Sequence, residues 1–345
     1  MLEEKTIEWV SEGDFGYCLT VDQTLIPYEY KKVKINSTEG VYNSIKTMIV
    51  RGAPAIGIMG AHGCSIAAYE LKNEDNFIEK LYKKFDYINS SRPTAVNLSW
   101  AIKSQIEVVE KNKDKTPLII YDELVKNAVK LENEDIIINK KIGDFGASLV
   151  PKGAGILTHC NAGALATVGY GTALGVIRSA FKNDKTIKVF ADETRPRGQG
   201  AKITTYELLR DKIPTTLITD GMCSYFMKKG MIDFVVTGAD RIASNGDSAN
   251  KIGTSTIAIA ARYYNIPFYI AAPKSTIDMS IKSGDDIVIE LRDENEVKIV
   301  NGKPICPMEV NVINPSFDVT DNGLIKGIIT EYGVFRPDEL KDVFS

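Results

Sequence analysis

The sequence is poor in the residues that build disulfide frameworks and metal centres. Its 345 residues include five cysteines and two histidines. The cysteines form an odd, scattered set without a CxxC pair, which argues against a disulfide framework and a structural zinc site and fits a reducing compartment. His62 and His159 stand in no metal-ligand pattern, so we expect no metal. The cysteines are Cys18, Cys64, Cys160, Cys223 and Cys306.

Long apolar runs and an excess of one charge are also missing. No apolar run reaches the roughly 18 residues that a membrane-spanning helix needs, and the first 15 residues contain acids and no apolar core of signal-peptide length. A net charge of −3 gives no general sign of nucleic-acid or membrane binding. We therefore expect a cytoplasmic protein with neither kind of partner.

The order of patterns along the chain predicts an α/β fold. Residues 7–35 alternate apolar and polar positions, which indicates short antiparallel strands, one of them at 24–27. From Thr38 to Leu149 the spacing is helical. After Pro151, short apolar runs alternate with helical stretches, which is typical of a parallel sheet with helices on both faces. The candidate strands are Gly155–Thr158, Ile187–Phe190, Thr216–Ile218, Phe234–Val236, Phe268–Ala271 and Ile287–Ile289.

We accordingly expect a smaller N-terminal domain of strands and helices (residues 1–130) followed by a Rossmann-like α/β catalytic domain (residues 131–345). In such sheets, ligands bind just beyond the carboxyl ends of the strands. The stretch 155–177 is central to this prediction, because a buried strand breaks at a polar turn and is expected to continue as a long helix of small residues.

Cys160 stands in that turn. A thiol at a helix N-terminus has a lowered pKa and can serve as an acid or base, whereas a small buried residue at a strand end is the structural alternative. The neighbouring His159 is expected to face away from Cys160, since successive residues of a strand point to opposite faces. This makes a Cys-His hydrolase a weak hypothesis.

Further polar residues follow other predicted strand ends. Asp240 ends the run VVTGAD, a position that favours catalysis or ligand binding, whereas Asp247 lies in a turn and is expected to bind local backbone groups. Asn250 and Lys251 are expected to open a helix, where they could hold an anion; a solvated surface lysine is the alternative.

Two arginines lie in matching contexts. Arg51 and Arg92 each precede a turn that opens a helix. A guanidinium beside free backbone N–H groups suits bidentate binding of phosphate or carboxylate. With Lys251, they make a phosphorylated small molecule a reasonable ligand.

The glycines at 169, 171 and 175 do not form a dinucleotide fingerprint. GxGxxG must follow a strand directly, and here the glycines are expected to lie inside the helix and to permit close packing. A GxxxxGK[ST] loop is absent as well. We therefore expect no nucleotide cofactor.

Taken together, these stretches resemble the methylthioribose-1-phosphate isomerase family, which shares its fold with the regulatory subunits of translation initiation factor 2B. The likeness covers nearly the whole chain. It rests on RGAPAIGI (51–58), RPTAVNL (92–98), THCNAGALATVGYGTALGVI (158–177), DETRPRGQGAKITTYEL (192–208), TGADRIASNGDSANKIGT (237–254), IPFYIAAP (266–273) and NPSFDVT (314–320).

The resemblance implies an aldose–ketose isomerase of methionine salvage, without metal or cofactor and dimeric. The matching catalytic residues are Cys160 and Asp240. The matching substrate-binding residues are Arg51, Gly52, Ala53, Arg92, Gln199, Asn250 and Lys251, of which the arginines and Lys251 would hold the phosphate.

Several positions depart from the family pattern: Arg197-Gly198, the run 222–225 and Lys274. Because of these departures, the sequence does not decide which chemical group the substrate carries at C5 of the sugar. Methylthioribose 1-phosphate and 5-deoxyribose 1-phosphate are both candidates. Ribose 1,5-bisphosphate would need a second basic site, for which Arg197 and Lys274 are the candidates. A non-catalytic regulatory subunit is the alternative from another functional class.

Overall fold

The computed structural model describes residues 5–93 and 96–344, which fall into two compact units. The N-terminal unit extends to Lys140 and includes Gly163–Gly171, and the C-terminal unit comprises Lys141–Ala162 and the chain from Thr172 onward. The boundary expected between residues 130 and 131 falls inside helix α5 (Pro117–Ala147). Thr94 and Ala95 of the motif RPTAVNL lie outside the described residues.

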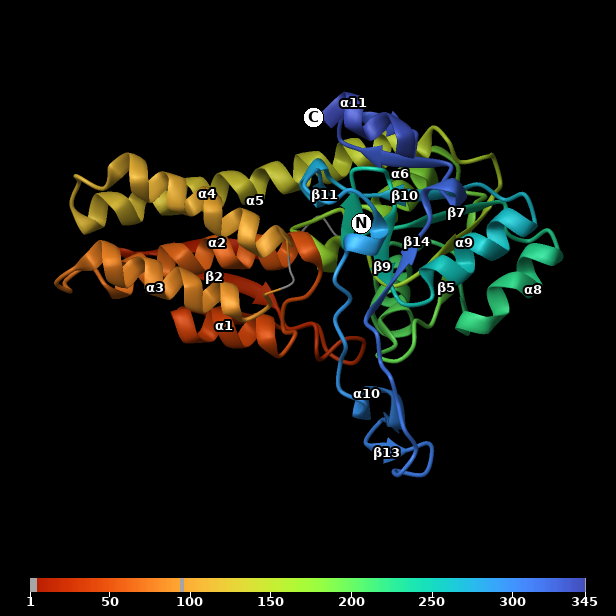
Figure 1. Ribbon diagram of the computed structural model, residues 1–345, viewed down its shortest axis with the longest axis horizontal. Helices are drawn as coiled ribbons and strands as arrows, with labels where there is room; N and C mark the ends of the chain where they lie inside the picture. The colour runs from red at the N-terminus through yellow and green to blue at the C-terminus, as the bar shows by residue number, and fades with distance from the viewer. Residues whose placement is uncertain (1–4, 94–95, 345) are drawn as a thin grey trace. The chain divides into compact units, whose positions relative to one another are not determined.

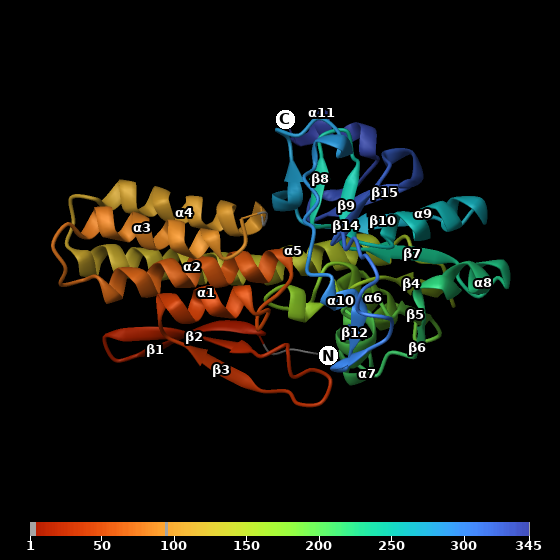
Figure 2. The same cartoon turned by 60° about the horizontal axis from the view of Figure 1, so that its bottom comes forward.

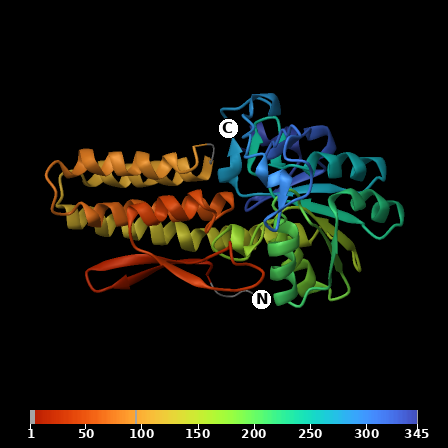
Figure 3. The ribbon, with the colours of Figure 1, turned by 90° about the horizontal axis from the view of Figure 1, so that it is seen from below.

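The N-terminal unit contains a three-stranded antiparallel sheet and a set of helices. The sheet, in the order β1-β2-β3, confirms the alternating pattern of residues 7–35 and lies along one side of the helices (Figures 2 and 3). The elements are β1 (Ile7–Glu12), β2 (Phe15–Val21), β3 (Lys32–Ile35), α1 (Thr38–Lys46), α2 (Ala53–Glu70), α3 (Phe77–Ser90), α4 (Val96–Asn112) and the first part of α5.

The strand predicted at 24–27 is wrong, because this segment forms a turn. The Oδ1 of Asp22 accepts hydrogen bonds from the backbone N–H and the hydroxyl of Thr24, at 3.0 and 2.6 Å. The carbonyl of Leu25 accepts from the backbone N–H of Tyr28 at 3.0 Å. An Asp two residues ahead of its partner competes with strand pairing in this way.

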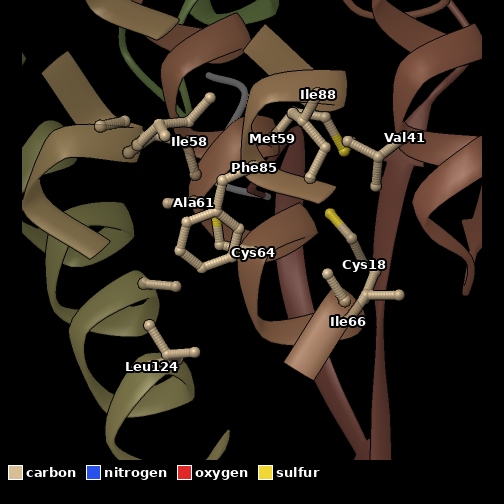
Figure 4. Close-up of a cluster of buried hydrophobic side chains, with 14 of the residues drawn as sticks. Cys18, Val41, Ile58, Met59, Ala61, Cys64, Ile66, Phe85, Ile88 and Leu124 are labelled. Carbon is tan, nitrogen blue, oxygen red and sulfur yellow. The ribbon is translucent and has the colours of Figure 1, made fainter. Parts of the chain in front are cut away.

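Helix α2 is the centre of the N-terminal core. All of its residues from Ala55 to Ala68 are buried, as expected of a helix that is apolar on every side. Side chains of α2 meet those of β2, α1, α3 and α5 in one cluster (Figure 4). Small residues allow α2 and α4 to approach each other closely, since an added Cβ at Gly57 of α2 would lie 2.8 Å from the Asn97 carbonyl oxygen of α4.

The C-terminal unit is built on a seven-stranded sheet in the order β16-β15-β10-β7-β4-β5-β6. Every neighbouring pair is parallel except β15 with β16. The strands are β4 (Gly155–Thr158), β5 (Lys188–Asp192), β6 (Thr215–Ile218), β7 (Phe234–Thr237), β10 (Phe268–Ala271), β15 (Gly327–Thr330) and β16 (Gly333–Phe335). This confirms the Rossmann-like α/β fold.

Helices lie between and after these strands, and the unit also contains a second sheet and a hairpin (Figure 1). The helices are α6 (Ala173–Asn183), α7 (Thr205–Arg210), α8 (Cys223–Lys228), α9 (Thr254–Tyr263) and α11 (Leu340–Phe344). The second sheet, in the order β11-β8-β9-β14, contains β8 (Arg241–Ala243), β9 (Ser248–Lys251), β11 (Ile277–Asp278) and β14 (Phe317–Thr320). The hairpin, which extends from the rest of the unit in Figure 1, contains α10 (Asn295–Lys298), β12 (Ile299–Val300) and β13 (Lys303–Pro304).

Two predictions for the chain after β4 are wrong. The chain after Cys160 does not continue as a long helix: residues 161–171 form loops and one 3₁₀ turn, and α6 begins only at Ala173. Glycines 169 and 171 lie in those loops, where residues 170 and 171 have positive φ, so the small residues make turns rather than helix contacts. Residues 287–289 form no strand; Ile287 packs instead against Ala243 and Ala249 of the second sheet.

Candidate active site

The candidate site of the C-terminal unit lies where the strand order reverses. From β4 the chain proceeds through β5 to β6 on one side, and from β7 through β10 to β15 on the other. The adjacent carboxyl ends of β4 and β7 therefore flank the crevice in which open α/β sheets bind ligands. The loops after both strands approach closely, because an added Cβ at Gly238 would lie 2.8 Å from the Cβ of Ala162.

Cys160 is held at this point by its backbone. Its φ is +63°, a left-handed conformation that is uncommon for a residue with a Cβ. Its N–H donates to the Thr194 hydroxyl oxygen at 2.9 Å, and its carbonyl accepts from the Thr204 hydroxyl at 2.6 Å. The expected helix N-terminus is absent, so the position of the thiol depends on the loop after β5 and on the π-helix Gly200–Thr204 that precedes α7.

The Gln199 side chain contacts the Cys160 thiol. Its Nε2 lies 3.6 Å from Sγ, and its Oε1 is buried without a hydrogen-bond partner among the described residues. The loop that carries Gln199 folds tightly onto β5: an added Cβ at Gly200 would lie 1.8 Å from the Asp192 carbonyl oxygen. The structure thus brings the predicted residues Cys160 and Gln199 together.

Asp240 lies at the carboxyl end of β7, beside the second sheet. Its N–H donates to the carbonyl of Ala249 at 2.9 Å, where β9 runs antiparallel to β8. The next two residues of β9 are Asn250 and Lys251. The hairpin β8–β9 therefore ties three of the predicted site residues to one element.

Asn250 and Lys251 were expected to open a helix, which is wrong: both belong to β9, and α9 begins at Thr254. Gly253 has a φ of +104° and makes the turn between strand and helix. Asn250 is buried and donates to the Thr254 hydroxyl at 3.0 Å, and the Lys251 ammonium lies 4.4 Å from the ring centre of Phe317. The two side chains remain next to the start of α9.

The remaining predicted residues lie in the N-terminal unit. Arg51 and Gly52 directly precede α2, and Ala53 is its first residue. Gly52 has a φ of +91°, and an added Cβ would lie 2.4 Å from the Ala166 carbonyl oxygen, so glycine is required there. Arg92 lies four residues before α4. The contact of Gly57 with the second residue of α4 places both helix starts at one end of the helix pair.

Comparison with known proteins assigns the family. The initiation factor 2 subunit family matches residues 49–337. The chain belongs to this family.

Relatives of the chain are similar over nearly the whole length. A methylthioribose-1-phosphate isomerase of Caldicellulosiruptor saccharolyticus is 51% identical over 92% of this chain and 93% of its own. The structure of 5-methylthioribose 1-phosphate isomerase from Pyrococcus horikoshii is 39% identical, with a TM-score of 0.89 over 99% of this chain and 96% of its own. The structure of translation initiation factor eIF-2B, subunit delta, from A. fulgidus is 41% identical, with a TM-score of 0.86 over 98% and 97%.

Family membership does not point to several polar residues that the structure places around Cys160. Asp220 accepts the backbone N–H groups of Thr194 and Arg195 at 2.8 and 2.7 Å and so shapes the loop after β5. Asn161 donates to Glu207 at 3.0 Å. These residues were not predicted from the sequence because they lie far apart in the chain; the one signal was that Asp192 lies two residues after the predicted strand Ile187–Phe190.

His159 directly follows β4 and has hydrogen-bond partners of its own. Its Nδ1 lies 3.2 Å from the Asp192 carboxylate, and its Nε2 donates to the Ile252 carbonyl at 2.9 Å. Asp247 binds backbone groups, but the prediction that these are local is wrong. It accepts the N–H groups of Gly284 and Asn322, both distant in sequence, at 2.9 Å each.

One cluster among the described residues has the composition of a metal site: His159, Asp192 and Asp220. The hydrogen bonds of these three residues fit a salt bridge between His159 and Asp192 better than a metal site. Both carboxylate oxygens of Asp220 already accept backbone N–H groups, and the neighbouring carboxylates raise the pKa of His159, which favours a protonated ring that cannot ligate a metal.

The unusual residue Arg197 takes part in an ion pair. Its guanidinium lies 2.8 Å from Glu296 of α10, and Arg195 donates to the carbonyl of Val297 at 2.8 Å. Hydrogen bonds from Arg292 and Arg197 to Glu296 outweigh its burial and lower the pKa of the carboxyl to about 2. The loop bearing Gln199 is thereby attached to the hairpin.

Among the described helices, none combines the length and apolarity that crossing a membrane requires.

Proposed function

We propose that this protein is an aldose–ketose isomerase that converts S-methyl-5-thioribose 1-phosphate to S-methyl-5-thioribulose 1-phosphate in methionine salvage. The observation that carries the proposal is the agreement of full-length relatives, of which one at 51% identity is named for this isomerase. The fold neighbour from Pyrococcus horikoshii is named for the same isomerase activity. Cys160 and Asp240 after adjacent strands at the switch point support it.

The reaction explains the need for an acid and a second proton-transfer group. In the substrate, C1 carries both the ring oxygen and the phosphate ester. The ring C1–O bond must break with protonation of the ring oxygen, hydrogen must move from C2 to C1, and the C2 hydroxyl must lose its proton, which balances the proton gained by the ring oxygen. The product has a ketone at C2 and keeps the phosphate at C1, so the change is redox-neutral within one molecule and requires no cofactor.

We assign proton donation to the ring oxygen to Asp240 and hydrogen transfer between C2 and C1 to the neighbourhood of Cys160. The thiolate acts as base if the hydrogen travels as a proton through an enol phosphate; a direct hydride shift would leave Cys160 to shape the pocket. In this proposal Gln199, Asn250 and Lys251 of the C-terminal unit bind the sugar phosphate. Arg51, Gly52, Ala53 and Arg92 of the N-terminal unit are proposed as substrate-binding residues from the resemblance alone. We further propose a cytoplasmic homodimer.

Replacing Arg51 or Arg92 by alanine is expected to weaken binding more than turnover. A hydrogen bond to a charged group contributes roughly 1.5–3 kcal/mol, so KM should rise about 10–100-fold while kcat changes less. Steady-state kinetics with methylthioribose 1-phosphate measure both values. Lys83→Ala, at an exposed ion pair of α3, is the control. An unchanged KM in both arginine variants would remove the arginines from phosphate binding.

The decisive experiment compares kcat/KM for methylthioribose 1-phosphate and 5-deoxyribose 1-phosphate with the purified protein. We expect the first to be preferred. A pocket that contacts the methylthio group gains roughly 1–3 kcal/mol from a few apolar atoms, which corresponds to about 10–200-fold. A preference for the second substrate would assign disposal of 5-deoxypentoses, and activity on neither would favour a regulatory subunit.

Ribose 1,5-bisphosphate is the weaker alternative. Its 5-phosphate would need a basic site, yet Arg197 is paired with Glu296 and the ammonium of Lys274 lies 5.5 Å from the ring centre of Phe344. Binding a second phosphate through Arg197 would first break a charge-assisted hydrogen bond.

A further inference from the structure

His159 is a completely buried histidine to which the proposed reaction gives no task. Its side chain has no exposed surface, and neither has that of Asp192. The ring uses both nitrogens, Nδ1 toward Asp192 at the end of β5 and Nε2 toward the Ile252 carbonyl between β9 and α9. An imidazole that donates from both nitrogens is an imidazolium.

The charges around the ring favour that form. Burial lowers the pKa of His159, but the hydrogen bond and charge of Asp192, the charge of Asp220 at 4.0 Å and the Ile252 carbonyl together raise it above the ordinary 6.5. Burial raises the pKa of Asp192 to about 6, against the effect of His159 and with small contributions from Asp220 and Glu193. Both shifts favour an ion pair between the imidazolium of His159 and the carboxylate of Asp192 at pH values between the two pKa values.

Each end of this pair holds a segment of the candidate site. The ring packs on the turn after Lys251, since an added Cβ at Gly253 would lie 3.1 Å from its Cε1. Asp192 belongs to the strand end whose carbonyl accepts the Thr194 hydroxyl at 3.2 Å, and that hydroxyl oxygen accepts the Cys160 N–H. The ion pair thus connects the backbone support of the thiol to the turn that follows Asn250 and Lys251.

We propose that His159, as an imidazolium bridging Asp192 and the Ile252 carbonyl, is a positioning residue that fixes Asn250 and Lys251 relative to Cys160. The inference rests on the proposed function, because it assigns these three residues to one substrate. The Cys223 thiol lies near Asp192, and burial raises its pKa to about 11, so it adds no charge near neutral pH.

The bridge that His159 forms between Asp192 and the Ile252 carbonyl depends on pH. Its ion pair requires Asp192 ionised and His159 protonated. It is lost as pH falls through about 6, where Asp192 takes up a proton, and as pH rises through the pKa of His159, which lies above 6.5. Both limbs are expected in the profile of kcat/KM for the free enzyme.

Replacing His159 by glutamine tests the bridge kinetically. Glutamine is neutral at every pH and reaches at most one of the two partners. A displacement of about 1 Å at the bound substrate costs roughly 100-fold, so kcat/KM should fall by about that factor, mainly through KM, and the limb at the pKa of His159 should vanish. Wild-type KM and pH profile in this variant would overturn the proposal.

The chemical shift of the ring carbon Cε1, measured by nuclear magnetic resonance, reports the protonation state of His159. The spectrum is simple to interpret because His62 is the only other histidine of the sequence. We expect the His159 resonance, assigned with either His62→Gln or His159→Gln, to titrate above pH 6.5, and Asp192→Asn to lower that pKa by at least about one pH unit. A neutral ring at pH 6.5, or no response to Asp192→Asn, would overturn the proposal even if His159→Gln does not fold. Lack of turnover by the wild-type protein would instead count against the proposed function and leave this titration valid.

Discussion

Replacing Asp240 by asparagine or Cys160 by serine is expected to lower kcat for methylthioribose 1-phosphate by about 10²–10⁴-fold, the usual contribution of one positioned acid or base. An amide cannot deliver a proton to the ring oxygen, and a hydroxyl is a far weaker acid than a thiol. Both replacements nearly conserve volume. The measurement is single-turnover and steady-state kinetics on variants with an unchanged circular dichroism spectrum.

Matched controls separate this effect from a general loss of structure. Cys306 lies in the hairpin region, and Asp338 lies on the surface beside Arg336. Cys306→Ser and Asp338→Asn should retain wild-type kcat and KM. Full activity of Cys160→Ser with a strongly impaired Asp240→Asn would favour a hydride shift, in which the thiol transfers no proton. Full activity of Asp240→Asn would remove that carboxyl from the mechanism.

The strands of the central sheet were predictable because each buried parallel strand is a short apolar run between polar turns. Gly155–Thr158 and Phe268–Ala271 were located to the residue. Ile287–Ile289 has the same local composition but packs on the second sheet, whereas β15 lies within a tail segment that was not assigned as a strand. Local hydrophobicity indicates burial, and the choice of neighbour depends on contacts distant in sequence.

The candidate site was predictable only in part. Cys160 and Asp240 follow from the rule that ligands bind at carboxyl ends of strands, and the resemblance supplied Gln199. What holds the thiol was not predictable: the small residues after it indicate a helix, but the backbone turns at Cys160 with positive φ and is fixed by Thr194 and Thr204. Hydrogen bonds between residues more than 30 positions apart leave no periodic pattern.

Arg178 offers the largest expected effect on stability. Its guanidinium is buried in α6 and binds Glu207 at 2.9 Å and Asp211 at 2.6 Å, both also buried. Replacing Arg178 by methionine leaves two carboxylates in the interior without this cation, which costs about 3–5 kcal/mol. The unfolding midpoint in urea, followed by circular dichroism, should fall accordingly, whereas Arg336→Met at an exposed ion pair should leave it unchanged.

A triple variant distinguishes the loss of the charge pair from the loss of packing. Arg178→Met combined with Glu207→Gln and Asp211→Asn removes the buried charges together, and replacing a complete buried ion pair is far less costly than breaking it. The triple variant should therefore recover much of the lost stability. Glu207 also accepts from Asn161, next to Cys160, and glutamine can still accept that hydrogen bond. Equal destabilisation of the single and triple variants would assign the role of Arg178 to packing of its aliphatic chain.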